Sequence, residues 1–417
     1  MSPSLTIFGF DRKQLELNSD CAAVAVAISL PWSTSATVIL VGLWLYALLA
    51  TLYFPGIRRE LATAAGGLPA LLFVLGALGM LWADVTWSER LRGLDSFFKI
   101  LMIPLLLYQF RRSGRGHWVL GAYLISCTLL LALSFTMVFS PQIAALRFLI
   151  THDFAVPTKN AATQSGEFIT CAFVLAFIAI EMFRAGRRKT AVCALALALG
   201  FLANVFYIAA SRTGLIVIAA LLPLLACKRF TVKGALVLLA AGAVLFAGAW
   251  TSSRYLQDRT TAVLEEIQIY RSENIRTSSG ERIEFAKKSM DFIKQAPVIG
   301  NGTGSIGELF RRAAAGESGA AALATANPHN QTFAVGIQLG IIGIAVLWAM
   351  WIAHLLLFRG VSLPAWVGLV VVVQNIVGSV FNSHLFDFTQ GWVYVFGVGV
   401  AGGMILRAHD TKPAPSQ

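Results

Sequence analysis

Charged residues are scarce in this chain. They make up 13% of its 417 residues, whereas a soluble domain usually carries about 25%. Apolar residues account for 57% of the sequence. Burial inside one globule cannot explain this composition, because even a large core needs a polar shell. The composition therefore excludes an ordinary soluble protein and predicts an integral membrane protein.

Several signatures of catalytic and metal sites are also missing. The chain has no G-x-x-x-x-G-K-[ST], no H-E-x-x-H, no D-x-D pair and no zinc-type cluster. The five cysteines form no C-x-x-C motif, and all of them fall within or at the ends of apolar segments. We therefore expect no disulfide, no metal site and no cofactor.

Acidic residues are fewer than basic ones, and the formal net charge is +12. In a soluble protein this balance would suggest a nucleic-acid partner. Here most basic residues flank apolar segments, where they act first of all as topology signals. We expect contacts with membrane lipids and no binding of nucleic acid.

Long apolar runs are what the chain does contain. A membrane-spanning helix needs roughly 20 apolar residues, and the runs predict an all-α protein with about 12 transmembrane helices. The opening residues carry several charges and no small-residue cleavage site, so we expect the first span to be retained as the insertion signal. The predicted spans lie near 20–31, 34–54, 66–85, 95–110, 117–139, 166–183, 189–210, 213–227, 233–251, 332–357, 362–381 and 388–407.

Basic residues are concentrated in every second connection between these spans. By the positive-inside rule those connections are cytoplasmic, which puts both termini inside and the hydrophilic segment 252–331 outside. The expected organisation is a transmembrane bundle over 1–251, an outer loop over 252–331 and C-terminal transmembrane helices over 332–417. The basic connections hold Arg58/Arg59, Arg111/Arg112/Arg115, Arg184/Arg187/Arg188/Lys189, Lys228/Arg229/Lys233, Arg359 and Arg407/Lys412.

The outer loop is predicted to contain short helices. Ser278 and Glu281 have the spacing of a capping box at the start of an amphipathic helix. Pro297 ends that helix, and Gly300–Gly304 is predicted to be a flexible turn. The alanine-rich stretch 312–326 is expected to be a second short helix or a mobile lid. The apolar face of the first helix carries Phe285, Ser289 and Phe292.

Ser211-Arg212-Thr213-Gly214 lies at the outer end of one span and the start of the next. Ser211 can cap the following helix, whose N-terminus carries partial positive charge. Arg212 adds a full charge with bidentate geometry suited to phosphate. This pattern favours an anion clamp; the alternative is an arginine that reaches along the membrane interface.

Asn327-Pro328-His329-Asn330 opens the tenth predicted span. Pro328 suits a first helical turn, so His329 is expected beside an outward-facing helix N-terminus. The helix dipole there disfavours imidazolium and favours the neutral ring that a general base requires. The alternative is a cap-region histidine that is hydrogen-bonded to a loop.

Further cationic side chains are expected on the outer side. Arg282 begins the amphipathic loop helix and could supply a second phosphate contact, although a solvated helix face often carries arginine. Such a site would suit an anionic leaving group and a deprotonated hydroxyl. Because no ATP is available outside, the donor must already be activated, as a lipid-linked sugar diphosphate is. Additional candidates for substrate binding are Arg90, Arg92, Lys159, Ser211 and Asn330.

The order of these motifs resembles the O-antigen ligase and O-antigen polymerase superfamily of bacterial envelope glycosyltransferases. The resemblance covers roughly residues 200–345. It rests on Ser-Arg-Thr-Gly at a helix start, Arg282 with Pro297-Val-Ile-Gly-Asn-Gly-Thr-Gly304 downstream, Pro328-His329-Asn330, and Gln338-Leu-Gly-Ile-Ile-Gly343. At Gln338 many relatives carry glutamate.

The resemblance implies a GT-C-like, metal-independent and inverting transferase of the Gram-negative inner membrane, with its active site facing the periplasm. The implied donor is an undecaprenyl-diphosphate-linked glycan. In the ligase branch the acceptor is an outer-core sugar hydroxyl of lipid A-core. The family's essential histidine matches His329, and its conserved arginines match Arg212 and Arg282.

Other functions stay open at this point. The polymerase branch joins two lipid-linked glycans, and a protein oligosaccharyltransferase is a smaller third branch. A transporter or flippase for lipid-linked glycan would have ionisable residues near the middle of its spans. Here Glu60 and Glu181 lie near span ends, which disfavours transport.

Overall fold

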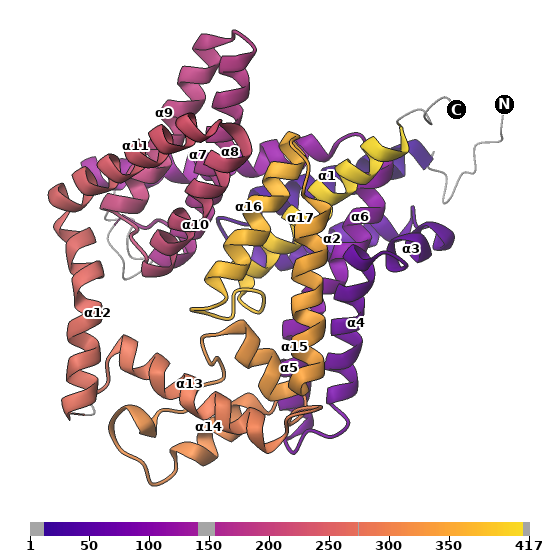
Figure 1. Ribbon diagram of the computed structural model, residues 1–417. Helices are drawn as coiled ribbons and strands as arrows, with labels where there is room; N and C mark the ends of the chain where they lie inside the picture. The colour runs from indigo at the N-terminus through magenta and orange to yellow at the C-terminus, as the bar shows by residue number, and fades with distance from the viewer. Residues whose placement is uncertain (1–11, 141–154, 274, 412–417) are drawn as a thin grey trace.

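In the computed structural model, residues 12–140, 155–273 and 275–411 are described, and they form helices without any β-strand (Figure 1). The helices, with η marking short 3-10 helices, are α1 (Arg12–Ser29), α2 (Thr34–Leu49), α3 (Phe54–Leu61), α4 (Ala64–Gly79), α5 (Trp87–Phe98), η1 (Lys99–Leu101), α6 (Met102–Arg112), α7 (Gly116–Phe139), α8 (Ala161–Arg184), α9 (Arg188–Tyr207), α10 (Arg212–Arg229), α11 (Val232–Ser252), α12 (Arg254–Glu273), α13 (Ser278–Gln295), α14 (Ile306–Ala314), η3 (Gly319–Ala322), α15 (Gln331–Leu357), α16 (Leu363–Gly378) and α17 (Phe388–Asp410).

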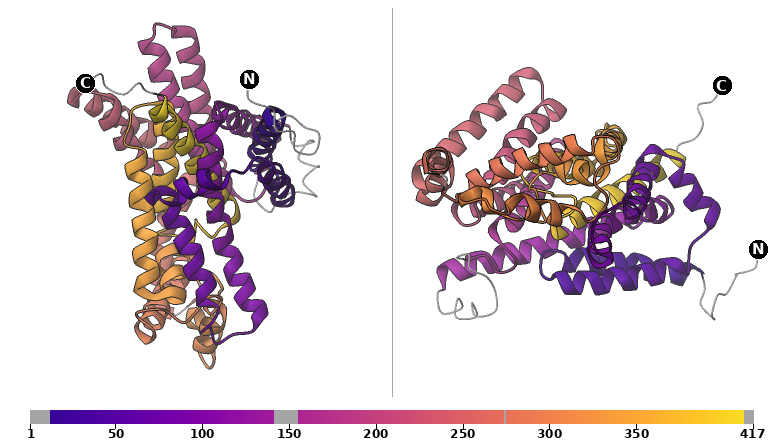
Figure 2. Two further views of the ribbon diagram at one scale, coloured as in Figure 1. Left: turned by 90° about the vertical axis from the view of Figure 1, so that its right-hand side faces the viewer. Right: turned by 90° about the horizontal axis from the view of Figure 1, so that it is seen from below.

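Helices from both ends of the chain build the centre of the molecule. α17 packs along α6 and α16, and α15 packs along α4, as the views in Figures 1 and 2 show. Hydrogen bonds between side chains also join helices inside this core: the indole nitrogen of Trp44 donates to Gln109 Oε1 at 2.7 Å. The C-terminal helices therefore do not form a separate unit from the N-terminal ones.

Within the described residues, six helices are long and apolar enough to cross a membrane, namely α7, α8, α9, α11, α15 and α17. The pair α2 and α3, bent by 118°, makes a seventh if it is counted as one span. The other predicted apolar segments also lie on helices, but these are shorter or more polar. Helix length and composition thus give six or seven candidate membrane spans among the described residues, and the larger predicted count stays a prediction.

The outer surface of the bundle is apolar. Val237 and Val244 of α11 are each 70% exposed. Only 6% of the 18-residue apolar stretch of that helix is buried inside the protein. Soluble monomers rarely expose contiguous apolar patches of more than a few hundred Å². A lipid environment explains this surface.

Ion pairs join connections that lie away from α13 and α14, the helices at the bottom of Figure 1. Arg111 lies 3.0 Å from the buried carboxylate of Glu60 and 2.8 Å from Asp410. Arg59 is also paired with Asp410, at 2.8 Å. Three connections that the charge pattern predicts to be cytoplasmic therefore meet at one end of the molecule.

The helix α15 is broken at Gly340. Its φ of 61° and ψ of −156° belong to a backbone region that essentially only glycine adopts. On one side of the break the carbonyl of Ile337 accepts a hydrogen bond from the N–H of Asn301 at 2.8 Å, and on the other the N–H of Ile341 donates to the carbonyl of Pro297 at 2.8 Å. Since unsatisfied backbone groups are costly in a membrane, the segment after α13 supplies the partners that the broken helix lacks.

The same segment is tied to α4. The N–H of Thr303 donates to the carbonyl of Gly79 at 3.0 Å, and its hydroxyl donates to the carbonyl of Gly76 at 2.5 Å. Gly304 lies so close to α5 that a Cβ there would stand 2.4 Å from a backbone carbonyl oxygen. Gly300–Gly304 thus forms a turn as predicted, but the turn is hydrogen-bonded to the bundle, and its glycines allow close backbone packing.

The loop helices agree with the sequence in part. α13 covers the predicted amphipathic helix and buries Phe285, Ser289 and Phe292, which confirms its apolar face. Its cap is Thr277, whose hydroxyl accepts from the N–H of Gly280 at 3.1 Å, so the predicted capping box begins one residue too late. The short helices α14 and η3 fall on and beside the alanine-rich stretch, whereas the sequence analysis did not predict α12.

We predict that Gly340→Ala destabilises the protein by about 1–3 kcal/mol, the cost of forcing a non-glycine residue into this conformation. A Cβ at this position would also lie 2.4 Å from the backbone of Val298. Thermal unfolding in detergent measures the loss. The control is Gly121→Ala in α7, where no atom lies within 4 Å of the added Cβ. Equal midpoints for the two variants would contradict the constraint placed on Gly340.

Candidate active site

His329 stands just before α15 in an unusual backbone conformation. Its φ is 53°, a left-handed value that is uncommon for residues other than glycine. The side chain of Asn327 accepts a hydrogen bond from the backbone N–H of His329 at 2.9 Å. The helix N-cap is Asn330, so Pro328 lies before the helix and not in its first turn, contrary to the prediction. Strained residues of this kind gather at functional sites.

The imidazole of His329 is half-buried between α13 and the connection from α16 to α17. Its ring stacks on Phe285, with centroids 5.8 Å apart and planes at 14°, and its Nδ1 lies 3.0 Å from Asn382 Oδ1. Burial lowers the pKa of His329 first, the charge of Arg282 lowers it further, and Asn382 and Glu281 partly oppose this. The ring is therefore neutral at neutral pH, as a general base must be.

Arg282 lies near this histidine on α13, half-buried. Within the described ranges it makes no hydrogen bond or ion pair with an acidic side chain. Burial lowers the pKa of Arg282, the charge of Arg212 lowers it further, and Glu266 opposes this. Two neighbouring guanidinium groups, one of them without an acidic partner, make a place suited to an anion.

Arg212 holds the loop helices against the start of α10. Ser211 caps α10 as predicted, its hydroxyl accepting from the N–H of Gly214 at 2.9 Å. Arg212 donates two hydrogen bonds to the carboxylate of Glu266 on α12, at 2.9 and 2.6 Å, and one to Ser279 on α13 at 3.2 Å. The hydrogen bond from Arg212 is the main cause that lowers the pKa of Glu266 to about 2.

Of the other predicted binding residues, Ser211 and Asn330 lie beside Arg212 and His329 as helix caps, whereas Arg90 and Lys159 make contacts in other parts of the bundle. Arg90 donates to the carbonyls of Val85 and Met80 at 3.0 and 2.9 Å. Lys159 pairs with Glu167 of α8 at 3.5 Å, and Asn330 caps α15 by accepting from the N–H of Phe333 at 3.0 Å. These three side chains are occupied by structural contacts.

A cavity of 350 Å³ with a mixed polar and apolar lining opens beside the histidine segment, between α5, α14 and the connection that precedes α17. Arg92 lines it and donates only to Ser88 of its own helix among the described contacts, at 3.3 and 3.1 Å. Asp387 and Asn327 line the wall nearest to His329. Arg92 is thus the one among these further candidates that faces a space large enough for a ligand.

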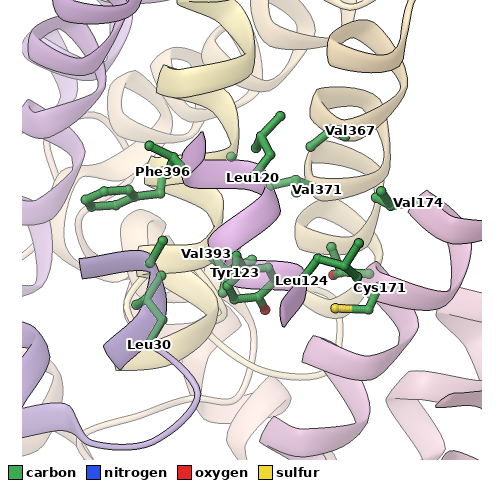
Figure 3. A pocket seen from close by; sticks show the side chains of 14 residues that line it. Leu30, Leu120, Tyr123, Leu124, Cys171, Val174, Val367, Val371, Val393 and Phe396 are labelled. Carbon is green, nitrogen blue, oxygen red and sulfur yellow. The ribbon is translucent and has the colours of Figure 1, made fainter. Parts of the chain in front are cut away.

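A second cavity is apolar and lies elsewhere in the bundle (Figure 3). It measures 60 Å³, and none of its lining residues is a predicted site residue. Leu120, Leu124 and Val371 project into it.

For metal binding, the described ranges contain no group of three or more His, Cys, Asp or Glu side chains that could hold an ion.

Four residues of this site were not predicted from the sequence, namely Glu266, Asn327, Asn382 and Asp387. Glu266 lies on α12, which was not predicted. Asn327 was part of the recognised motif but received no role. Asn382 and Asp387 lie in Asn382-Ser-His-Leu-Phe-Asp387, a polar connection between two apolar spans whose composition offered a signal.

Comparison with known proteins identifies one segment of the chain. A family model described as O-Antigen ligase matches residues 195–348, which contain Arg212, Arg282 and His329. The match agrees with the resemblance seen in the sequence motifs. No curated protein matches the chain significantly.

We predict that Arg282→Gln raises the pKa of His329. The substitution removes a positive charge that disfavours the imidazolium form, so protonation becomes easier and the neutral ring is lost at a higher pH. Modification of His329 by diethyl pyrocarbonate, followed against pH by peptide mass spectrometry, measures the shift. Lys294→Gln is the control, because this lysine is exposed and pairs with Asp291 on the same helix. If the pH dependence of His329 modification is the same in Arg282→Gln as in the wild type, the charge of Arg282 does not act on His329.

Proposed function

We propose, from the match of residues 195–348 to the O-antigen ligase family model, that the chain is a glycosyltransferase of lipopolysaccharide biosynthesis. It takes a glycan from undecaprenyl diphosphate and transfers it to an outer-core sugar hydroxyl of lipid A-core. The reaction takes place on the periplasmic side of a Gram-negative inner membrane. Both chain termini are cytoplasmic, and the remaining apolar helices bring the number of spans to about 12.

One observation carries this proposal: His329 packs against the loop helix α13, and Arg282 of that helix has no acidic partner among the described residues. The ring of His329 stacks on Phe285 of α13, the helix that also carries Arg282. A transferase that uses a diphosphate leaving group needs a base for the acceptor hydroxyl and positive charge for the departing oxygen. The two residues supply these functions.

In the proposed reaction the Nε2 atom of His329 accepts the proton of the acceptor hydroxyl. The resulting oxygen attacks the anomeric carbon of the donor sugar from the side opposite the diphosphate. A carbon–oxygen bond forms on that side while the bond to the diphosphate oxygen breaks, so the configuration inverts. Undecaprenyl diphosphate leaves with the electron pair, and preorganised guanidinium groups stabilise its added charge.

Arg282 binds the diphosphate directly, and Arg212 joins it by exchanging partners. In the present arrangement Glu266 holds two hydrogen-bonding positions of Arg212, which a phosphate could occupy with similar geometry. Displacement of Glu266 would free α12 from the start of α10. Closure of the 252–331 loop over the donor would then exclude water and limit hydrolysis.

The acceptor sugar occupies the 350 Å³ cavity whose lining includes Asn327 and Pro328, the two residues before His329. The amide, carboxylate and guanidinium groups in its mixed wall suit sugar hydroxyls, which both donate and accept hydrogen bonds. Arg92 is the side chain in this wall whose described contacts leave it most available. The polymerase branch would place a second lipid-linked glycan here, so the acceptor distinguishes the two branches.

We predict that His329→Ala lowers glycosyl transfer by at least about 10²-fold, the smallest share that general-base catalysis usually supplies. His329→Asn should lose as much activity, and it keeps the left-handed backbone because asparagine tolerates it. Thermal unfolding should show both proteins folded. A near wild-type transfer rate in either variant would contradict the role of His329 as the base.

We also predict opposite effects for the two halves of the Arg212–Glu266 pair. Arg212→Ala should abolish transfer, whereas Glu266→Gln should lower the KM for the donor, because the diphosphate no longer competes with a carboxylate. Transfer assays at varied donor concentration give both values. If Glu266→Gln loses as much activity as Arg212→Ala, the pair only holds the loop in place.

The function itself is tested with purified protein, lipid-linked glycan and lipid A-core, in the presence of a chelator and without ATP. A glycan–lipid A-core conjugate is the expected product. Elongated lipid-linked glycan made without lipid A-core would identify a polymerase instead, and the absence of both products would reject the glycosyltransferase.

A further inference from the structure

A chain of side-chain hydrogen bonds leads away from His329. Its Nδ1 lies 3.0 Å from Asn382 Oδ1, and Asn382 Nδ2 donates to Asp387 Oδ2 at 2.6 Å. Asn327 Nδ2 donates to the same Asn382 oxygen at 3.0 Å. All of these groups are at least partly buried. The contacts join the histidine motif to the connection between α16 and α17.

The donor and acceptor of each hydrogen bond in this series can be assigned starting either from Asp387 or from Asn327. An ionised Asp387 can only accept, so the Asn382 atom that faces it is the amide nitrogen and the oxygen faces His329. From the other end, Asn327 Oδ1 accepts from the backbone N–H of His329 and from Ser383, so its nitrogen faces Asn382. Both routes leave Asn382 Oδ1 as an acceptor, and His329 Nδ1 must then carry the hydrogen.

We propose that Asn382 and Asp387 are positioning residues that hold His329 as its Nδ1–H tautomer and thereby leave Nε2 as the basic nitrogen. The tautomer follows from the contacts themselves. Its catalytic consequence rests on the proposed function. In the absence of such contacts histidine in water favours the Nε2–H form, in which Nε2 has no lone pair to accept a proton.

Asp387 is itself held in place by distant parts of the chain. The amine of Lys99 on η1 donates to the backbone carbonyls of Phe386 and Asp387 at 2.8 and 2.9 Å. The side chain of Gln331, at the start of α15, accepts from the N–H of Leu385 at 3.0 Å. The carboxylate therefore has a defined position relative to the helix that follows His329.

The charged groups around the chain favour this arrangement at neutral pH. Arg282 and Glu281 act on His329 from α13, and Lys99 acts on Asp387 from η1. Burial raises the pKa of Asp387 to about 6, and Lys99 and Asn382 oppose it. Above that pH Asp387 is ionised and accepts from Asn382, and His329 is neutral.

Neither positioning residue lies within the segment 195–348 that matches the family model. Their contact with the histidine depends on how α16 and α17 pack against α15 and η1. In this proposal the C-terminal helices therefore determine which ring nitrogen of His329 carries the hydrogen.

The tautomer can be measured without any substrate. Nitrogen–proton correlation spectra of the protein with 15N-labelled histidine show which ring nitrogen carries the hydrogen, and His329→Asn identifies the signal. We expect Nδ1–H in the wild type and a shift towards Nε2–H in Asn382→Ala. Asn160→Ala is the matched control, since Asn160 only caps α8, and it should keep the wild-type spectrum. An Nε2–H ring in the wild type would overturn the proposal.

Kinetics then test the catalytic consequence. Asn382→Ala should lower kcat by about 10²-fold, at the lower end of the share due to a general base, with little change in KM. Asp387→Asn should retain most activity, because an asparagine oxygen can still accept from Asn382, whereas Asp387→Ala should lose it. In a His329→Asn background the Asn382→Ala change should cost nothing more, because both act through one group.

An additive loss in the double variant would assign Asn382 to the fold and reject its action through His329. The outcomes for the two proposals stay separate. If no glycosyl transfer occurs with any acceptor, the proposed function fails, and the spectra alone decide the tautomer. If transfer occurs but the wild-type ring is the Nε2–H form, the proposed function stands and the positioning role fails.

Discussion

The break of α15 at Gly340 is the constraint on which the rest of the site depends. A helix broken inside a membrane protein needs other partners for its backbone groups, and the segment between α13 and α14 supplies them. Because that segment is also bonded to α4 through Thr303, the loop helices are fixed to the bundle. Phe285 of α13 then lies on the ring of His329, and the imidazole is partly removed from water.

Removal from water determines the electrostatics of the site. A positive charge costs more in a poorly solvated place than in water, so His329 is kept neutral beside the charged Arg282, which in turn has Arg212 as a neighbour. Arg212 gains compensation from Glu266, whereas Arg282 has no acidic partner among its described contacts. The two arginines therefore carry more positive charge than Glu266 neutralises, and this excess attracts an anion with more than one negative charge. A diphosphate has this property, and its departure from the sugar increases the charge.

Much of the helical arrangement could be predicted because it depends on local sequence. Apolar runs of spanning length became helices, Ser211 caps α10, and the apolar face of α13 is buried as its periodicity indicates. The predictions that were incomplete or wrong concern segments whose conformation is decided by distant partners. Gly300–Gly304 looked like a free turn because glycine is common in turns, yet its glycines permit contact with α4, α5 and α15.

The sequence by itself determined that the chain is a helical membrane protein and that His329 stands at the start of a helix. It also showed the order of the motifs that contain Arg212, Arg282 and His329. These features follow from composition and from residues close together in the chain. The tertiary structure alone decided the partners: Glu266 for Arg212, Asn382 for His329, and Lys99 for the backbone at Asp387. A side-chain hydrogen bond reaches only about 3 Å, so which remote groups meet depends on how the helices dock, and no local pattern records that.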